Sequence, residues 1–256
     1  MDIFLYAIIF VIGIFFGSFF TLAVYRIPRN EDILIKHSYC PNCNHKLGFF
    51  DLFPVFSYIF LKGRCRYCKN KIRPRYLILE LLSGFTFAII AFSLKINFFN
   101  ISNIARITFL LLYVAVLFIV AGIDKENLKV QKRVLVFGYI IEAIYIIYQY
   151  ALGYSNVYQY VMYLMCFIIL LILTNLSYKI FLKEKYFIQI LYLCMYILIF
   201  NGSTIFTISV IFTLISVVLY SIISKNKAKR IPIGFYLCVS NILVIIMLNI
   251  MVNYMI

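Results

Sequence analysis

Two Cys-x-x-Cys pairs lie in the only long polar stretch of this otherwise strongly apolar chain. Cys40 and Cys43 form the first pair, and Cys65 and Cys68 form the second, with 21 residues between the pairs. A two-residue spacing lets both sulfurs of a pair converge on one ion, and two such pairs complete a tetrahedron. The pattern therefore predicts a zinc site with four thiolate ligands, and its closed ligand set indicates a structural role.

The alternative for these cysteines is a set of unmetallated or redox-active thiols. A loop on the reducing cytoplasmic side of a membrane favours metal ligands over disulfides. The polar stretch is also too short for a large core, so a metal could stand in for one. His37 and His45 flank the first pair. Either could join the metal, but a solvated loop histidine is the simpler interpretation.

Apolar residues are gathered in runs of the length that crosses a bilayer. The chain is 65% hydrophobic and only 13% charged, whereas a soluble domain carries roughly a quarter charged residues. A transmembrane helix needs about 20 apolar residues. The runs predict an all-α polytopic membrane protein with eight transmembrane helices, at 3–24, 77–94, 103–123, 134–152, 158–178, 187–200, 204–223 and 233–255.

These spans divide the sequence into three predicted parts. Residues 1–25 form the first transmembrane helix, 26–76 a small cytoplasmic zinc domain with the four cysteines, and 77–256 a seven-helix membrane domain. The first span has no basic start and no small-residue cleavage site before Tyr25, so we expect it to remain uncleaved.

The basic charge of the chain follows the predicted loops. A net charge of +15 could suggest a nucleic-acid partner, but Lys and Arg also mark the cytoplasmic loops of membrane proteins. If 26–76 is cytoplasmic and the sides alternate, 22 of the 24 Lys and Arg residues lie on that side, within 26–76, 124–133, 179–186 and 224–231. The segregation predicts a multi-pass protein of the plasma membrane with both termini external, partnered by the lipid bilayer and not by nucleic acid.

Three carboxylates fall in or at the ends of the predicted spans. An intramembrane carboxylate is costly and is a functional candidate by default. Asp124 ends the third span, where the alternative is a side chain that reaches the headgroups. Glu80 could pair with Arg73 or Arg75 near the interface, and Glu142 could hydrogen-bond to a neighbouring span.

Several short motifs occur along the chain in a specific order and spacing. They are 17–28, the cysteine pairs with Pro54, Ser57, Tyr58 and 62–65, then 75–82, Asp124 in Gly-Ile-Asp, and 230–234. Together with the topology, they resemble the type IV prepilin peptidases, which are membrane enzymes of the leader peptidase and N-methyltransferase type, and the resemblance extends nearly end to end. Thr21 stands in the first motif where the family usually has Asn, and the usual Pro is missing after Tyr76.

The resemblance implies an aspartic endopeptidase at the cytoplasmic membrane surface, with Asp124 as its first catalytic aspartate. Two such carboxylates would share a proton, one activating water and the other polarising the scissile carbonyl. The substrate would be the basic leader of a type IV prepilin or pseudopilin, for pilus assembly or protein secretion. The new N-terminus would then be methylated from S-adenosylmethionine, although no glycine-rich motif for that cofactor is readable.

The second aspartate of the family has no counterpart in this chain. It belongs to a Gly-x-Gly-Asp motif at the start of the sixth span, where residues 181–188 read Phe-Leu-Lys-Glu-Lys-Tyr-Phe-Ile, and no Asp follows Asp124. Glu184 is the candidate substitute, and the alternative is a solvated loop residue. The Ile-Pro expected after the first aspartate is replaced by Val130 and Gln131.

Whether the chain is an active enzyme is therefore open at the level of the sequence. The resemblance implies a prepilin peptidase whose peptidase activity is impaired, or lost altogether in a pseudoenzyme. Two alternatives are a non-catalytic protein that binds or assembles pilins and a chain that retains methyl transfer only. A zinc-bearing transporter is disfavoured, because the spans hold too few polar residues for an ion path.

Overall fold

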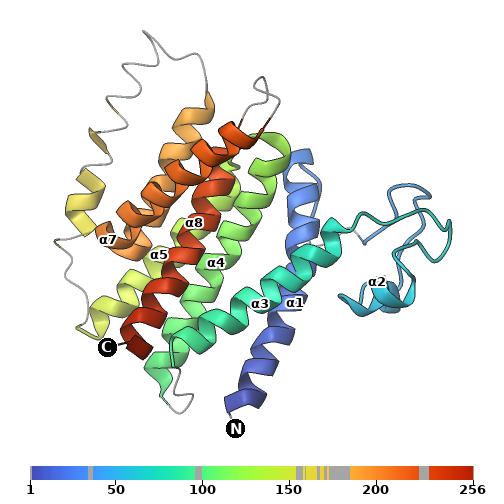
Figure 1. Cartoon of the computed structure of the whole chain (residues 1–256), viewed down its shortest axis with the longest axis horizontal. Coiled ribbons are helices and arrows are strands. Elements are labelled where there is room, and N and C mark those ends of the chain that lie inside the picture. The colour runs from blue at the N-terminus through green and yellow to red at the C-terminus, as the bar shows by residue number, and fades with distance from the viewer. Residues whose placement is uncertain are drawn as a thin grey trace. The chain divides into compact units, whose positions relative to one another are not determined.

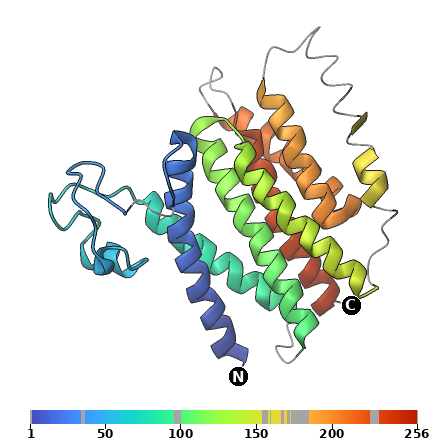
Figure 2. The ribbon, with the colours of Figure 1, turned by 180° about the vertical axis from the view of Figure 1, so that it is seen from behind.

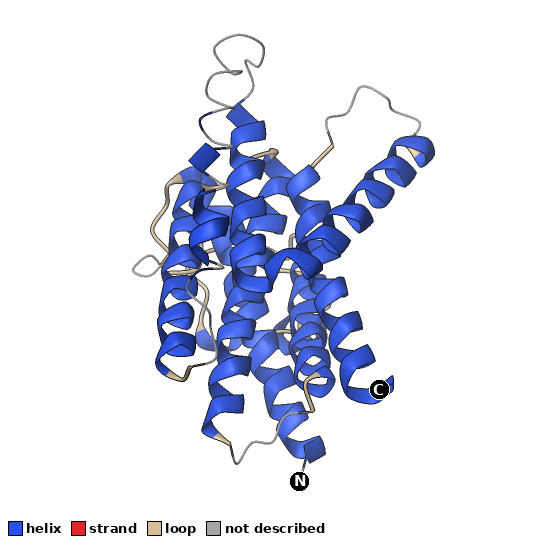
Figure 3. Ribbon diagram, turned by 90° about the vertical axis from the view of Figure 1, so that its left-hand side faces the viewer, coloured by secondary structure: helices blue, strands red, loops and turns tan. Residues whose placement is uncertain are grey.

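The computed structural model describes residues 2–33, 37–95, 100–153, 158, 160–165, 168–169, 172, 185–224 and 231–255. Every regular element in these ranges is a helix, as Figure 3 shows, and the remaining residues form turns, loops and two isolated β-bridges. This confirms the predicted all-α class. The α-helices are α1 (Asp2–Arg26), α2 (Phe56–Phe60), α3 (Arg75–Ser93), α4 (Ile101–Asn127), α5 (Lys132–Ala151), α7 (Lys185–Ile223) and α8 (Ile233–Ile250). Two short 3-10 helices, η1 (Ile27–Arg29) and η2 (Phe49–Asp51), and a short π-helix, η3 (Met251–Met255), accompany them.

Six helices of the described residues are long and apolar enough to cross a membrane. Five of them, α1, α3, α4, α5 and α8, correspond to predicted spans. The sixth, α7, covers both 187–200 and 204–223 and is broken at Gly202, whose φ of 76° lies outside the helical region. The remaining predicted span, 158–178, falls largely outside the described residues.

The break at Gly202 turns α7 into a helical hairpin. Tyr186, near the start of α7, lies close to the beginning of α8, because the Gly234 N–H donates to its hydroxyl over 3.4 Å. Tyr220, near the end of α7, meets the ring of Tyr236 with centroids 5.8 Å apart. Both ends of α7 therefore lie at the start of α8, and Figures 1 and 2 show the two halves folding back on each other. A glycine suits the turn because it adopts positive φ without a steric penalty.

The chain forms two compact units, Met1–Phe98 with Asn253–Ile256, and Phe99–Val252. In the first unit α1 and α3 pack closely through small residues. A Cβ on Gly17 would lie 2.6 Å from the Cα of Glu80, and the Ser83 hydroxyl donates to the Gly13 carbonyl over 2.7 Å. Small residues and interhelical hydrogen bonds are the usual means by which helices associate in lipid.

In the second unit, a buried polar network connects α4, α7 and α8. The Tyr113 hydroxyl donates to Asn241 over 2.8 Å, and the Asn201 amide donates to that hydroxyl over 2.7 Å. The Asn241 amide in turn donates to Ser209 over 3.0 Å. Glu142 does not join this network. Both of its carboxyl oxygens are buried and have no hydrogen-bond partner among the described residues, so the expected bond to a neighbouring span is not found in that part of the chain. Most of the predicted span 158–178 lies outside it.

Candidate functional site

The four cysteines lie in two turns of the same local design. In the first, the Cys40 N–H donates to the His45 carbonyl over 3.0 Å and the Asn44 N–H donates back to Cys40 over 2.8 Å. In the second, the Cys65 N–H donates to Asn70 over 2.9 Å and Lys69 donates to Cys65 over 3.0 Å. Asn44 and Lys69, each just after a pair, share positive φ values of 55° and 59°. We call these turns the first knuckle (39–46) and the second knuckle (64–71), after the β-bridges that close them.

The two knuckles bring all four thiols to one point. The four Sγ atoms lie within 4.8 Å of one another, and those of Cys40 and Cys68 are 3.9 Å apart. Tetrahedral zinc with sulfur at about 2.3 Å requires a sulfur–sulfur separation of about 3.8 Å. The cysteines thus form a cluster that could hold a metal ion, as the sequence predicted, and they are free thiols rather than disulfides.

The protonation of these thiols also suits a cation. Burial raises the pKa of the Cys40 thiol, but the backbone amides of Cys43 and Asn42 outweigh it and lower the pKa to about 7. At Cys68 the backbone amide of Asn70 lowers the pKa, whereas burial and the neighbouring thiols raise it to about 11. Mutual repulsion opposes the ionisation of all four adjacent thiols, and a bound divalent metal would remove that obstacle.

Neither histidine belongs to the cluster of potential ligands. His37 and His45 are both exposed, and the group of side chains that could bind metal consists of the cysteines alone among the described residues. The His45 ring instead stacks on Tyr67 of the second knuckle, with centroids 3.6 Å apart. The imidazole therefore contributes contact between the knuckles.

The loop that carries the knuckles is tied to both helices of its unit. The guanidinium of Arg26, at the end of α1, is buried and donates to the carbonyls of Asp32 and His37, both over 3.0 Å. Glu80 on α3 accepts a hydrogen bond of 2.7 Å from the Val55 N–H. The sequence had suggested an arginine partner for Glu80, but its carboxylate accepts a hydrogen bond from a backbone N–H of the loop instead.

Asp124 lies where three helix ends of the second unit meet. It occupies the last turn of α4 and is fully buried, with 0% exposure. Its Oδ2 accepts from the Tyr186 hydroxyl at the start of α7 and from the Phe235 N–H in the first turn of α8, each over 2.9 Å. Its Oδ1 is buried and has no hydrogen-bond partner in the described part of the chain. A side chain directed to the headgroups is thereby excluded.

Two neighbours of Asp124 were missed in the sequence. Tyr186 was read only as part of a basic loop, and Gly234 only as part of a motif. Gly234 is required for close approach, because a Cβ there would lie 3.0 Å from Asp124 Oδ2 and 3.2 Å from the Ile190 side chain. No local sequence signal identifies these residues, since the hydrogen bonds of Asp124 join positions 62 and 111 residues apart.

We expect Gly234→Ala to destabilise the second unit. The added methyl group must displace the buried carboxyl of Asp124 or the end of Ile190, and overpacking of this kind costs about 1–3 kcal/mol. Thermal unfolding in detergent should show a lowered midpoint. Gly48→Ala is the matched control, since its Cβ would have its nearest neighbour at an ordinary 3.6 Å. Equal midpoints for both variants would contradict the close packing at Asp124.

The candidate partner Glu184 lies outside the described residues. Among the described residues at the ends of α4, α7 and α8, the other carboxylate is Glu126, which is exposed just beyond Asp124. From α7, the Tyr186 hydroxyl donates a hydrogen bond to Asp124.

Comparison with protein families identifies the N-terminal part of the chain. Residues 11–94 match the family model described as the bacterial peptidase A24 N-terminal domain. This range covers most of α1, the loop with both knuckles and α3. No solved structure matches the chain.

Comparison with individual proteins gives a consistent result. A prepilin leader peptidase/N-methyltransferase of Myxococcus xanthus is 38% identical over 79 residues, which cover 31% of this chain and 24% of the relative. A protein of that name from Vibrio cholerae is 38% identical over 98 residues, which cover 35% of this chain and 37% of the relative. Another from Bacillus subtilis is 31% identical over 133 residues, which cover 51% of this chain and 50% of the relative. The chain thus spans a quarter to half of the length of these relatives. The matches confirm the resemblance to the type IV prepilin peptidase family.

Proposed function

We propose that this chain is a multi-pass protein of the bacterial plasma membrane that acts on the leaders of type IV prepilins or pseudopilins, with weakened peptidase activity. The observation that carries the proposal is the placement of Asp124. A fully buried carboxyl at the meeting point of three helix ends, with one oxygen lacking a hydrogen-bond partner among the described residues, supports a functional role for Asp124.

The hydrogen bonds of Asp124 suggest a different role for each of its two carboxyl oxygens. Oδ2 is held by Tyr186 and by the Phe235 amide in the first turn of α8, where the helix dipole favours negative charge. Oδ1 remains to accept a proton from an attacking water. A second carboxyl that polarises the scissile carbonyl would have to be Glu184, whose side chain is longer than that of the family's aspartate. This substitution is the reason to expect slow cleavage.

The four cysteines would hold a structural zinc ion. Bound metal would supply a cross-link between the two knuckles, and Cys40, Cys43, Cys65 and Cys68 would fill its coordination shell. Because no ligand position stays open, we assign the zinc no part in the cleavage. Its effect on function would be exerted through the fold of the loop.

Two alternative functions are compatible with the same fold and involve no cleavage of the prepilin. The absence of any Asp after Asp124 in the sequence favours a protein that binds or assembles pilins without cutting them. Methyl transfer from S-adenosylmethionine to a pilin N-terminus could also persist alone, as the names of the relatives pair that activity with the peptidase.

Co-expression with a prepilin distinguishes the candidates. The intact mass of the pilin would show an uncut chain for a binding protein, a shortened chain for a peptidase, and a further methyl group where transfer occurs. A pilin supplied already cut tests methylation separately. We expect a minor shortened fraction and a major uncut one. An entirely uncut and unmethylated pilin would refute both enzymatic assignments.

We predict that the loops 26–76, 124–133, 179–186 and 224–231 are cytoplasmic and that both termini are external. The positive-inside tendency of Lys and Arg is the reason. With the three cysteines outside the cluster changed to serine, Lys129→Cys should react with a membrane-impermeant thiol reagent only from the cytoplasmic face. A cysteine added at the C-terminus should react only from outside. A C-terminus reached from the cytoplasm would mean that the number of spans is wrong.

A further inference from the structure

The loop of the first unit contains a strongly exposed aromatic stretch, which we call the aromatic segment (49–60). It comprises η2, a turn and α2. Phe49, Phe50 and Phe60 are 75%, 77% and 80% exposed. Soluble surfaces rarely present large contiguous apolar patches unless something covers them. The exposed apolar side chains of the segment are Phe49, Phe50, Leu52, Phe53, Phe56, Ile59 and Phe60.

A ring contact places this segment beside α1 rather than beyond its end. Phe53 meets Phe15 edge to face, with centroids 5.7 Å apart. Phe15 precedes Arg26, the last residue of α1, by 11 positions, which at 1.5 Å per residue is about 16 Å along the helix. Figure 1 accordingly shows α2 level with the middle of α1. In a helix that crosses a core of about 30 Å, this depth belongs to the hydrocarbon.

The backbone of the segment is prepared for such an environment. Val55 has a φ of 63°, and its N–H would lack a partner in the sharp turn after Pro54. The buried Glu80 supplies that partner over 2.7 Å. The Ser57 and Ile59 amides donate to the carbonyls of Phe53 and Val55, over 3.0 and 3.1 Å. Satisfaction of backbone groups within the protein is what a lipid environment demands.

Two polar side chains of the segment, those of Asp51 and Tyr58, form hydrogen bonds to residues that follow the segment in the loop. Asp51 is only 5% exposed and accepts from Arg66 over 2.6 Å and from Tyr67 over 3.2 Å. The Tyr58 hydroxyl donates to the Ile72 carbonyl over 3.4 Å. The surface left open is therefore apolar.

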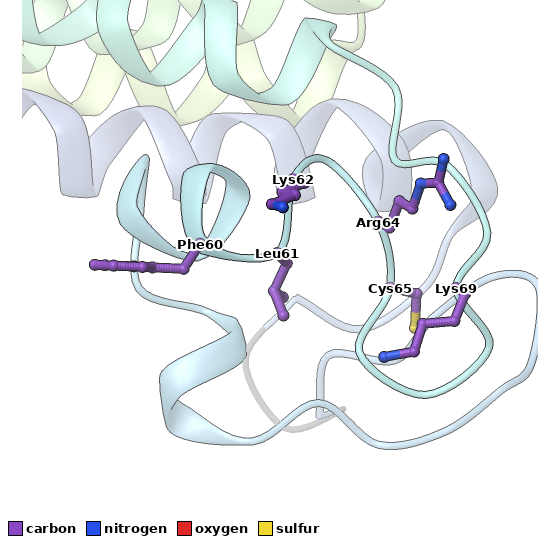
Figure 4. A pocket seen from close by; sticks show the side chains of 6 residues that line it. All are labelled: Phe60, Leu61, Lys62, Arg64, Cys65 and Lys69. Atoms are coloured by element: carbon purple, nitrogen blue, oxygen red, sulfur yellow. The ribbon is translucent and has the colours of Figure 1, made fainter.

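Basic side chains lie next to the end of the aromatic segment. Figure 4 shows Phe60 at one end of a pocket that it lines together with Lys62, Arg64 and Lys69. A basic peptide would be repelled by these cations, whereas anionic headgroups would be attracted to them. Aromatic rings directed into a membrane with Lys and Arg at the headgroup level are the pattern of interfacial segments.

We propose that the aromatic segment is inserted among the lipid acyl chains of the leaflet that surrounds the C-terminal end of α1. The exposed rings continue the apolar surface of α1, where Phe15 is itself 48% exposed. The two knuckles then lie at the level of the headgroups and the water. This proposal does not depend on the enzymatic function, because it rests on the contacts of the first unit alone.

The chain contains no Trp, so a single introduced Trp reports its own surroundings. Phe50→Trp and Phe60→Trp place the probe at the most exposed rings, and Phe15→Trp provides a reference on α1. Lys46→Trp, at an exposed position of the first knuckle, is the control. Each full-length variant is reconstituted into vesicles of anionic and neutral lipids, some carrying bromine on the acyl chains. Quenching by bromine and by aqueous acrylamide is then measured.

We expect bromine to quench the fluorescence of Phe50→Trp and Phe60→Trp nearly as strongly as that of the α1 reference. The quenching should be several-fold stronger than in the knuckle control, and acrylamide should quench both variants weakly. Strong acrylamide quenching without bromine quenching would place the rings in water and overturn the proposal. Protection from both quenchers would show that a second copy or another protein covers the segment, which equally overturns it. Agreement between the two positions excludes an effect of one substitution on folding.

Discussion

Replacing Cys65 with serine should remove zinc from the purified protein and lower the yield of folded chain. The unsubstituted protein should carry about one zinc per chain, as expected for a four-thiolate site. Cys65 is buried in the cluster, and structural zinc sites contribute apparent binding energies of about 10–16 kcal/mol that are also folding energy. Because the substitution leaves only three thiolate ligands, we expect near-complete loss of metal, measured by elemental analysis of protein kept under reducing conditions.

Cys194→Ser is the matched control for this experiment. Cys194 lies on α7, is only partly buried and does not belong to the cluster. Its substitution should leave the zinc content unchanged. Absence of zinc from the unsubstituted protein, or a disulfide mapped between knuckle cysteines, would contradict the metal site.

Replacing Asp124 with asparagine should abolish whatever leader cleavage the chain performs. Asparagine keeps an oxygen that can accept from Tyr186 and Phe235, so the fold at the three helix ends should be retained. It cannot take a proton from water, and loss of one member of a catalytic unit costs several orders of magnitude in rate. The measurement is the fraction of prepilin shortened during co-expression, with the level of each variant in the membrane determined in parallel.

Glu126→Gln provides the control for Asp124→Asn. It removes a negative charge two residues away, at an exposed position outside the buried site. Cleavage should continue in this variant at the rate of the unsubstituted chain. Cleavage that survives Asp124→Asn would overturn the aspartic mechanism, whatever the result for Glu126→Gln.

The features that could be predicted from the sequence are those that depend on residues close together along the chain. The cysteine cluster follows from two local spacings, and each knuckle closes through hydrogen bonds within a few residues. The spans follow from local apolar composition. Even the break in α7 coincides with the gap left between two predicted spans, because Gly202 and its polar neighbours interrupt the apolar run.

Partners that come from distant parts of the chain could not be predicted. Two arginines near Glu80 in the sequence were its predicted partners, yet its carboxylate accepts a hydrogen bond from the Val55 amide. The positive φ of Val55, which leaves that amide in need of a partner, cannot be read from the sequence. Glu142 was expected to bond across helices, but its carboxyl oxygens are buried and have no hydrogen-bond partner among the described residues. The same limit applied to Asp124, whose position was predicted but whose partner Tyr186 was not.

The central claim is that this chain retains an aspartic site at Asp124 but lacks the family's second aspartate. The most direct measurement is the initial rate of leader release from a prepilin by the purified protein in liposomes, beside the Vibrio cholerae relative. We predict a rate lower by orders of magnitude, which Glu184→Gln lowers further. A rate equal to that of the relative, unchanged by Glu184→Gln, would contradict the account.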